Sequence, residues 1–138
     1  MAYFSLQSET HSVKSNTNDL FDYMSDFNHF KHLLPTDKIE NFECTSEQCS
    51  FSIKGLTTLT IKIKDASRSS ATNPNSKITF ETLGLAKFVF TLHIHLVANQ
   101  TTHVQMEGDL NPFIKVMAEK PLLELINTMA LKLSQIEI

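Results

Sequence analysis

Histidine is the residue type in this chain best suited to chemistry, because its imidazole can bind metals or move protons near neutral pH. The chain has six histidines, and His93 and His95 alternate along one predicted strand, FVFTLHIHLVA. If this strand pairs with the next one as a hairpin, His93 faces Asp109 and His95 faces Glu107, a donor set that could hold a divalent cation. All four side chains fall on the polar face. We interpret them as solvent-exposed cross-strand pairs and predict no metal site.

Two further groups could also do chemistry. His29 and His32 are three residues apart on a short predicted helix, but no third ligand has the spacing of a metal site. Cys44 and Cys49 are predicted to be direct cross-strand neighbours, so a disulfide is geometrically conceivable. We expect reduced thiols in the core instead, because the chain is predicted to be cytoplasmic.

Acid–base catalysis in an apolar pocket needs an ionisable group held inside it. The alternation of the strands places no Asp, Glu, Lys or His on the inner face. Two places stay open: the first strand, which could aim Glu9 or His11 inward, and the start of the last helix, with Lys115 or Glu119. We therefore predict no catalytic residue and no cofactor. The inward positions are Phe42, Phe51, Ile53, Leu59, Ile61, Ile63, Ile78, Phe80, Phe88, Phe90, Leu92, Ile94, Leu96, Met106 and Leu110.

Length and charge exclude several classes of function. A chain of 138 residues is long enough for one domain with one core, so residues 1–138 are predicted to form a single domain. A net charge of −3 provides no basic field for nucleic acid. The first residues lack the pattern of a secretory leader, and no run of eighteen apolar residues occurs. We expect a cytoplasmic protein without stable membrane insertion.

Strand pairing can be predicted from the parity of the apolar residues. Pairing Cys44 with Cys49 brings Phe42 opposite Phe51, so one face stays apolar. By the same reasoning the following hairpin pairs Ile53 with Leu59, and the last hairpin of the sheet pairs Leu96 with Met106. A first strand over residues 3–13 alternates less regularly, which indicates a bulge or a frayed start.

The helices are predicted from capping residues and helical periodicity. Asn16 or Thr17 caps a short helix, and a second short helix follows it and stops at Pro35. Residues 112–136 show an apolar stripe at spacings of three and four, which is typical of one long helix. Pro121 lies inside this pattern and should bend the helix.

These elements predict an α+β fold in which a curved, seven-stranded antiparallel sheet wraps around the C-terminal helix, with two short helices between the first and second strands. One sheet face and one helix stripe must bury each other, and a cavity between them is the expected by-product. The predicted floor of this binding site is Phe51, Ile53, Leu59, Ile61, Phe80, Phe90, Leu92 and Met106, and its roof is Met117, Leu122, Ile126 and Met129.

Three turns at one end of the predicted sheet carry apolar residues where polar ones are usual. They are Leu56, Leu85 and Phe113. One interpretation is a portal for an apolar ligand, or a contact patch for a membrane or a partner. The alternative is that the three side chains complete the core beneath the long helix.

The order of elements, together with the stretches DFNHFKHLLP, FSIKG and GDLNPFIKVMAEKPL, resembles the SRPBCC superfamily, whose fold is the START-like or birch-pollen-allergen-like helix grip. The resemblance is strongest to small bacterial members often labelled polyketide cyclase-like. It implies the helix-grip fold, and it implies functions that range from binding lipids, sterols or polyketides to cyclase activity and assistance of chaperone ATPases. We expect a carrier of a small hydrophobic molecule. The alternatives are a polyketide cyclase-like enzyme and a protein-interaction or co-chaperone-like domain with a filled core.

Overall fold

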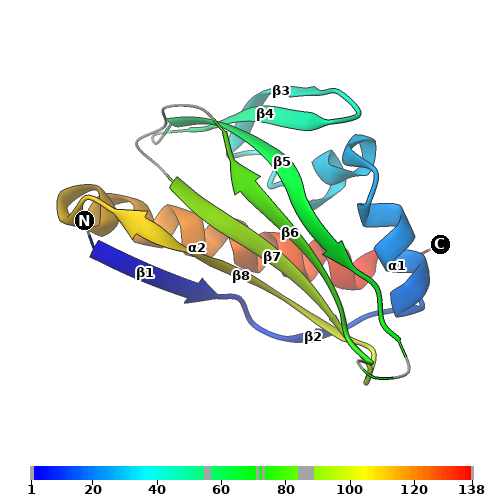
Figure 1. Ribbon diagram of the computed structural model, residues 1–138. Coiled ribbons are helices and arrows are strands. Elements are labelled where there is room, and N and C mark those ends of the chain that lie inside the picture. The colour runs from blue at the N-terminus through cyan, green and yellow to red at the C-terminus, as the bar shows by residue number, and fades with distance from the viewer. Residues whose placement is uncertain (1, 55–56, 71, 73, 84–88, 138) are drawn as a thin grey trace.

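The computed structural model describes residues 2–54, 57–70, 72, 74–83 and 89–137. Short strands and two short helical segments come first, a run of antiparallel strands follows, and one long helix ends the chain (Figure 1). The elements are β1 (Ala2–Gln7), β2 (His11–Ser12), α1 (Thr17–Met24), the 3₁₀ helix η1 (Phe27–Leu33), β3 (Ile39–Cys44), β4 (Gln48–Ile53), β5 (Thr57–Ser67), β6 (Ser76–Thr82), β7 (Val89–Val97), β8 (Thr101–Leu110) and α2 (Pro112–Gln135).

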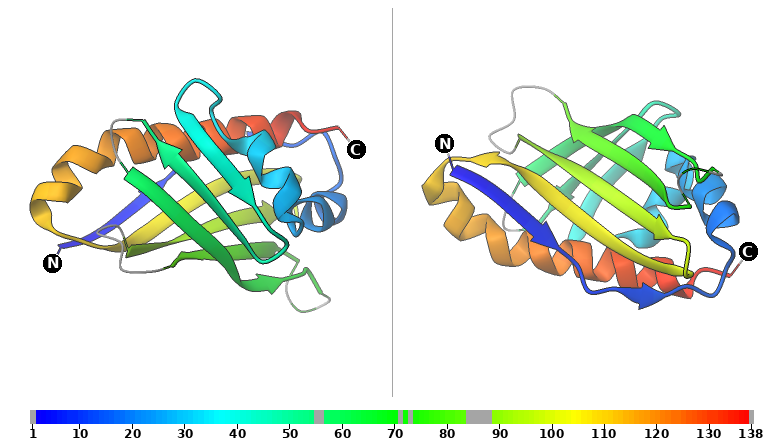
Figure 2. Two further views of the ribbon diagram at one scale, coloured as in Figure 1. Left: turned by 90° about the horizontal axis from the view of Figure 1, so that it is seen from above. Right: turned by 60° about the horizontal axis from the view of Figure 1, so that its bottom comes forward.

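The strands form one antiparallel sheet in the order β1-β8-β7-β6-β5-β4-β3, and the two-residue β2 pairs with β8 beyond the end of β1. The predicted first strand is therefore two pieces, broken at residues 8–10, which explains its irregular alternation. The sheet curves strongly around one side of α2, as the two views of Figure 2 show. The α+β class, the curved antiparallel sheet and the long C-terminal helix are thus as predicted.

Helix α2 begins where the sequence places its cap. The side chain of Asn111 accepts a hydrogen bond from the backbone N–H of Phe113, and Pro112 occupies the first turn, where its missing N–H has no cost. The helix continues through Pro121, and Figure 2 shows that it is curved. It packs against β8, β1 and η1. Its buried side chains are Ala118, Leu122, Leu125, Ile126, Met129, Ala130, Leu133 and Ser134.

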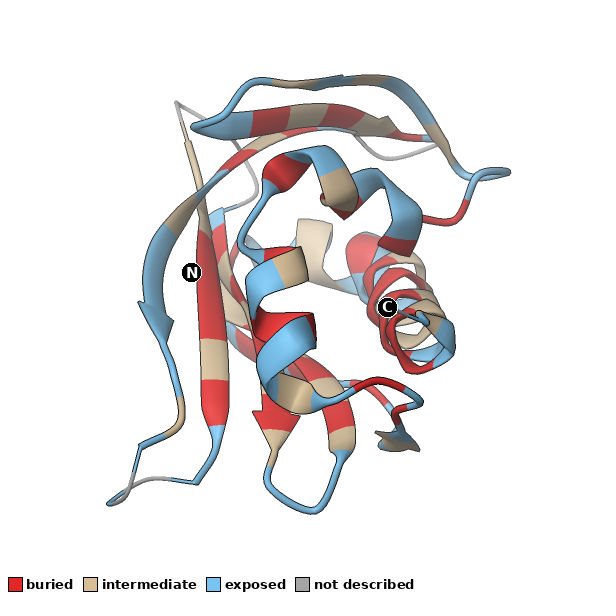
Figure 3. Cartoon of the chain, turned by 90° about the vertical axis from the view of Figure 1, so that its right-hand side faces the viewer, coloured by how far each residue is buried: buried red, intermediate tan, exposed pale blue. Residues whose placement is uncertain are grey.

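The two short helices stand between the sheet and the C-terminal half of α2 (Figure 3). Each is capped by a side chain: Asn16 accepts from the N–H of Asn18, and Asp26 accepts from the N–H of Asn28. Buried Pro35 follows η1, consistent with the predicted stop. Both helices contain buried residues, coloured red in Figure 3, and these residues are apolar: Leu20, Phe21 and Met24 in α1, and Phe27, Phe30 and Leu33 in η1.

The observed registers correct two of the predicted hairpins. Phe51 pairs with Leu59, so the predicted partner of Ile53 is wrong by two residues. Met106 pairs with Leu92 rather than Leu96, a difference of four residues. Both errors are even numbers, so every side chain keeps its predicted face of the sheet.

The hairpin of β3 and β4 has the predicted pairing at Cys44 and Cys49, followed by a bulge between Glu40 and Glu43. Asn41 in this bulge has a φ of 56°, a left-handed conformation that asparagine tolerates better than most residues. The rings of Phe42 and Phe51 still lie on the same face, with centroids 6.5 Å apart.

Candidate binding site

The predicted floor and roof residues form the core of the molecule rather than an obvious lining. With the exception of Met117, all of them are at most 6% exposed and belong to one buried cluster. Ile53 and Phe90 also line surface hollows. The hollow at Ile53 lies between the sheet and α2, and the hollow at Phe90 lies on the outer face of the sheet. The buried members are Phe51, Ile53, Leu59, Ile61, Phe80, Phe90, Leu92, Met106, Leu122, Ile126 and Met129.

Aromatic rings from η1 occupy much of the space where the sequence placed a ligand. The ring centroid of Phe30 lies 5.3 Å from that of Phe80 and 6.2 Å from that of Phe51. The ring of Phe27 lies 5.7 Å from that of Phe80. These are ordinary packing distances for aromatic pairs. The short helix therefore fills this part of the interior between the sheet and α2 with its own side chains.

The placement of Met117 in the roof is wrong. Its side chain is 62% exposed on the first turns of α2, next to Phe113 at 80% and Val116 at 79%. The three side chains and Pro112 line an open surface hollow of about 380 Å³. Phe113 is thus an exposed apolar residue at this end of the molecule, as the portal interpretation requires. The other two predicted portal residues, Leu56 and Leu85, lie outside the described residues.

The first strand does not bring an ionisable group into the interior. Phe4 and Leu6 point inward, whereas Glu9 is exposed and His11 is partly exposed. The backbone N–H of Glu9 donates to the side-chain oxygen of Asn127 at 3.0 Å, which connects the break in the strand to α2.

Across the described residues, the buried polar side chains are all hydroxyls: Ser8, Ser15, Ser76, Thr79, Thr102 and Ser134.

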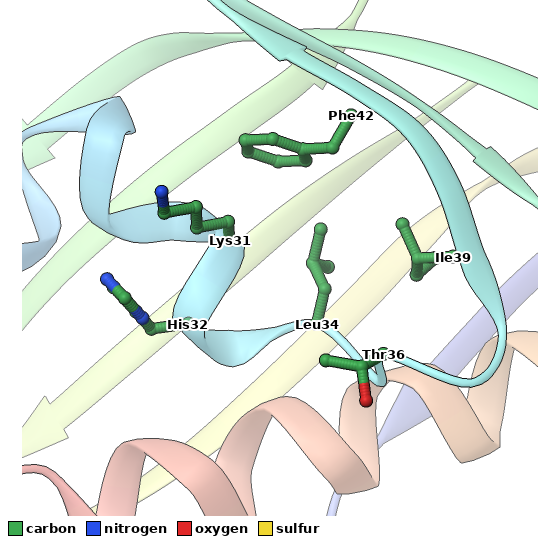
Figure 4. Close-up of a pocket in the computed structure, with 6 residues that line it drawn as sticks. All are labelled: Lys31, His32, Leu34, Thr36, Ile39 and Phe42. Carbon is green, nitrogen blue, oxygen red and sulfur yellow. The ribbon is translucent and has the colours of Figure 1, made fainter.

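A hollow of about 330 Å³ opens between η1 and β3, where the chain passes from the short helix into the edge strand. Its apolar part is made by Leu34, Ile39 and Phe42, and Lys31 and His32 stand at its rim (Figure 4). Thr36 completes the lining. The volume lies at the lower end of the range for small-molecule sites.

A second hollow, of about 200 Å³, lies on the other side of the same connection. Ile39 lines both hollows, so the two adjoin. Here the sheet contributes Ile53, and α2 contributes Pro121 and Leu125. This is the place where the predicted gap between sheet and helix reaches the surface.

One ion pair spans the second hollow. Lys38 from the connection donates to the carboxylate of Glu124 on α2. The hydrogen bond to Lys38 lowers the pKa of Glu124, and the same bond raises the pKa of Lys38. Because both groups are exposed, this pair contributes little to stability. It does offset one positive charge of the site.

The paired hollows offer an apolar surface with cationic groups beside it. Lys31, His32 and Lys54 line them, and among the described residues no ion pair engages Lys31 or Lys54. Among the described residues that line the two hollows, the carboxylate is that of Glu124, which is paired with Lys38. Such a surface can hold an apolar molecule by burial of its surface and an acidic group by charge.

The histidines of β7 lie on the outer face of the sheet, but with partners other than those predicted. His93 is opposite Gln105 and His95 is opposite His103, because the register differs by four residues. The ring of His95 stacks on that of His103 with centroids 4.4 Å apart. The predicted pairs of His93 with Asp109 and His95 with Glu107 are therefore wrong as direct cross-strand pairs.

A chain of hydrogen bonds nevertheless crosses this face. Thr79 lies 2.9 Å from Nδ1 of His93, whose Nε2 lies 3.0 Å from the carboxylate of Glu107. The hydroxyl of Tyr3 donates to the other oxygen of Glu107 at 2.9 Å. These bonds use both nitrogens of His93 and lower the pKa of Glu107, with the Tyr3 bond as the largest cause. Thr79 is only 6% exposed, so the hydrogen bond with His93 satisfies a buried hydroxyl. We interpret the arrangement as a network of structural hydrogen bonds across the strands.

Neither group of histidines is joined by enough other potential ligands, among the described residues, to make a three-ligand cluster. No cluster of three or more His, Cys, Asp or Glu side chains with suitable geometry occurs among the residues that the structure describes. His29 stacks on Tyr23 with ring centroids 3.9 Å apart, and its Nδ1 is 2.8 Å from the carbonyl oxygen of Tyr23. Its contacts are therefore those of a packed aromatic residue.

Cys44 and Cys49 form a disulfide, so the expectation of reduced thiols is wrong. Their Cα atoms are 4.2 Å apart on paired residues of β3 and β4. The register itself was predicted correctly. The error came from assigning the thiol state by the expected compartment, when the cross-strand geometry favoured a bond.

The sequence reasoning missed most of the residues that line the paired hollows. It followed the alternating strands and the helix stripe, whereas Lys31, Leu34 and Thr36 belong to a short helix end and an irregular connection. One signal was present in LLPTDK, where two leucines precede a proline and the chain then turns polar. That pattern marks a helix end beside apolar surface, but it does not show what faces it.

No protein-family model matches the chain, and no curated protein matches it. Similar solved structures do exist. The protein XoxI from Bacillus cereus is 11% identical with a TM-score of 0.55, and the match covers 96% of each chain. An uncharacterised protein from Bacillus thuringiensis is 12% identical with a TM-score of 0.53, over 94% of this chain and 96% of that one.

These similarities concern the fold alone, because the sequence identity is low. The chain shares with these two bacterial proteins an α+β architecture in which a curved antiparallel sheet packs on a C-terminal helix. Within the described part of the chain, neither α1 nor α2 combines the length and apolarity needed to cross a membrane.

Proposed function

We propose that this chain is a helix-grip protein that binds a small apolar or amphipathic molecule, in the groove formed by the paired hollows between η1, β3 and α2. The SRPBCC resemblance and the element order support the helix-grip assignment. The observation that carries the binding proposal is the pair of adjoining hollows around Ile39, which have an apolar floor and lie where sheet and helix separate. A carrier function follows from the apolar floor and from an interior whose buried polar groups, within the described residues, are hydroxyls.

The groove replaces the deep cavity expected from the sequence. Since Phe27 and Phe30 pack on the inner sheet face, a ligand would lie on the outer side of η1 rather than beneath it. An open groove buries less of a ligand than an enclosed cavity does, so the expected affinity is modest, on the order of micromolar. A shallow site of this kind suits loading and release.

The test uses phenylnaphthylamine, an uncharged apolar dye whose fluorescence rises in apolar surroundings. The dye absorbs at longer wavelengths than tyrosine or tryptophan, so protein emission does not interfere, either in the wild-type chain, which has no tryptophan, or in variants that introduce one. We expect saturable binding at one molecule per chain. Thr36→Trp should abolish it, because Thr36 is exposed and lines the hollow, so a large side chain there fills the site without disturbing the core.

Two controls separate the groove from other apolar surfaces. Thr10→Trp places the same side chain at an exposed position in the break between β1 and β2, and should leave binding unchanged. Phe113→Ser removes a large apolar side chain that is 80% exposed and should also leave binding unchanged. Binding lost in Phe113→Ser but kept in Thr36→Trp would refute the groove. No saturable binding at all would refute the carrier function and favour an interaction domain with a filled core.

A further inference from the structure

We infer that the groove selects amphipathic anions: the apolar part of the ligand lies on Leu34, Ile39 and Phe42, and Lys31 and His32 bind its acidic group. This inference rests on the proposed function, because it specifies the chemical class of ligand for the same site. The acidic group is a carboxylate, sulfonate or phosphate carried on an apolar body of modest size.

The first observation is the separation of chemistry within one hollow. In Figure 4 the side chains of Lys31 and His32 project to the same side, whereas Leu34, Ile39 and Phe42 lie together on the other. The two basic side chains therefore form one end of the hollow and the apolar side chains form the other. A ligand that matches both ends has a polar head and an apolar body.

The second observation is the sign of the charge. The described residues that line this hollow include a lysine and a histidine and no carboxylate. Of the acids nearby, Asp26 caps η1 through the N–H of Asn28 and Glu124 pairs with Lys38, whereas Asp37, next to Thr36 in the chain, is exposed and lines neither hollow. The ammonium group of Lys31 has no ion-pair partner among the described residues, so it is available to a ligand.

The third observation is that this pair of basic groups belongs to an acidic chain. With a net charge of −3, the protein does not attract anions at long range. Selectivity for an anion must then come from direct contact with Lys31 and His32. Both side chains are exposed, so the contribution of each contact is small, and the loss of Lys31 should weaken anion binding about fivefold.

The experiment compares two dyes with the same aromatic frame, phenylnaphthylamine and anilinonaphthalene sulfonate, which differ by the acidic group. We expect the sulfonate to bind more tightly than the neutral dye. In Lys31→Gln, the affinity for the sulfonate should fall about fivefold while the affinity for the neutral dye is unchanged. Lys31→Arg should retain the preference for the sulfonate. Lys64→Gln makes the same change in net charge at an exposed position of β5 and should have no effect.

Competition with decanoate, decanol and inorganic phosphate tests the two halves of the inference separately. Decanoate should displace the bound sulfonate more effectively than decanol, and phosphate alone should displace it poorly. Equal displacement by phosphate and decanoate would overturn the amphipathic requirement. A sulfonate preference that survives in Lys31→Gln would overturn the role of Lys31. Neither of these results affects the proposed carrier function as long as the neutral dye binds the wild-type protein and Thr36→Trp blocks that binding. If the neutral dye does not bind the wild-type protein, the carrier function itself is refuted.

Discussion

Replacing Phe30 by alanine should be among the most destabilising single changes in the short helices. Phe30 is 1% exposed, and its ring contacts those of Phe27, Phe51 and Phe80 at centroid distances of 6.0, 6.2 and 5.3 Å. These neighbours are anchored on η1, β4 and β6, so they cannot all move in to fill the space of a lost ring. Removing a buried phenyl ring from such a site costs about 3–5 kcal/mol.

The assay is urea unfolding followed by far-ultraviolet circular dichroism, because the chain lacks tryptophan as a fluorescent reporter. We expect Phe30→Ala to lower the free energy of unfolding by about 4 kcal/mol, a large part of the ~5–15 kcal/mol that stabilises a typical domain. Phe113→Ala is the matched control. Its side chain is 80% exposed, and the expected change is within about 0.5 kcal/mol.

A second readout links this substitution to binding. The space vacated by Phe30 lies between the sheet and η1, where the sequence alone predicted a ligand cavity. Under conditions in which Phe30→Ala stays folded, phenylnaphthylamine should bind at an additional interior site. If Phe30→Ala lowers the free energy of unfolding by less than about 1 kcal/mol, the ring is not packed as described, and the explanation given for the filled interior is refuted.

Three further predictions concern other parts of the sheet. Gly108→Ala should lower the free energy of unfolding by about 2–3 kcal/mol in urea, because an added Cβ would lie 2.4 Å from the carbonyl oxygen of residue 89 on β7; an unchanged midpoint would contradict this. Burial lowers the pKa of His95 and of His103. The unfolded chain therefore takes up these protons first, so stability should be constant above about pH 7.5 and should fall as the pH drops through about 6.5. Urea midpoints measured across this range should fall less in His95→Gln, and a parallel fall in both proteins would exclude His95 as a cause. Reduction of the Cys44–Cys49 disulfide should cost at most ~2 kcal/mol, since it closes a short loop, and alkylation without reductant should leave both cysteines unmodified in the folded protein.

The faces of the strands could be predicted from the sequence because alternation is a local property. Phe51, Leu59, Phe80, Leu92 and Met106 are all buried, as their parity requires. The registers could not be predicted with the same certainty. A shift of two or four residues leaves every side chain on the same face, so the apolar pattern does not distinguish among such pairings.

The caps and ends of the helices were also local and were predicted correctly. Asn16 and Asn111 cap their helices through their own side chains, and Pro35 follows the end of η1. By contrast, the contents of the interior depended on where η1 lies. Its apolar face was recognised, but whether it covers a cavity or fills one depends on the distance between the sheet and α2, which no local pattern specifies.

By itself, then, the sequence determined the types of the elements and the side of the sheet that the strand residues face, although it did not show the break between β1 and β2 in the predicted first strand. The tertiary structure decided the strand registers, the bond between Cys44 and Cys49 and the position of the groove around Ile39. The physical reason is the distance along the chain over which each interaction acts. Capping and alternation act between residues close in the chain, whereas packing of η1 on the sheet and the approach of Lys31 to Phe42 join segments whose relative position is fixed only when the whole core closes.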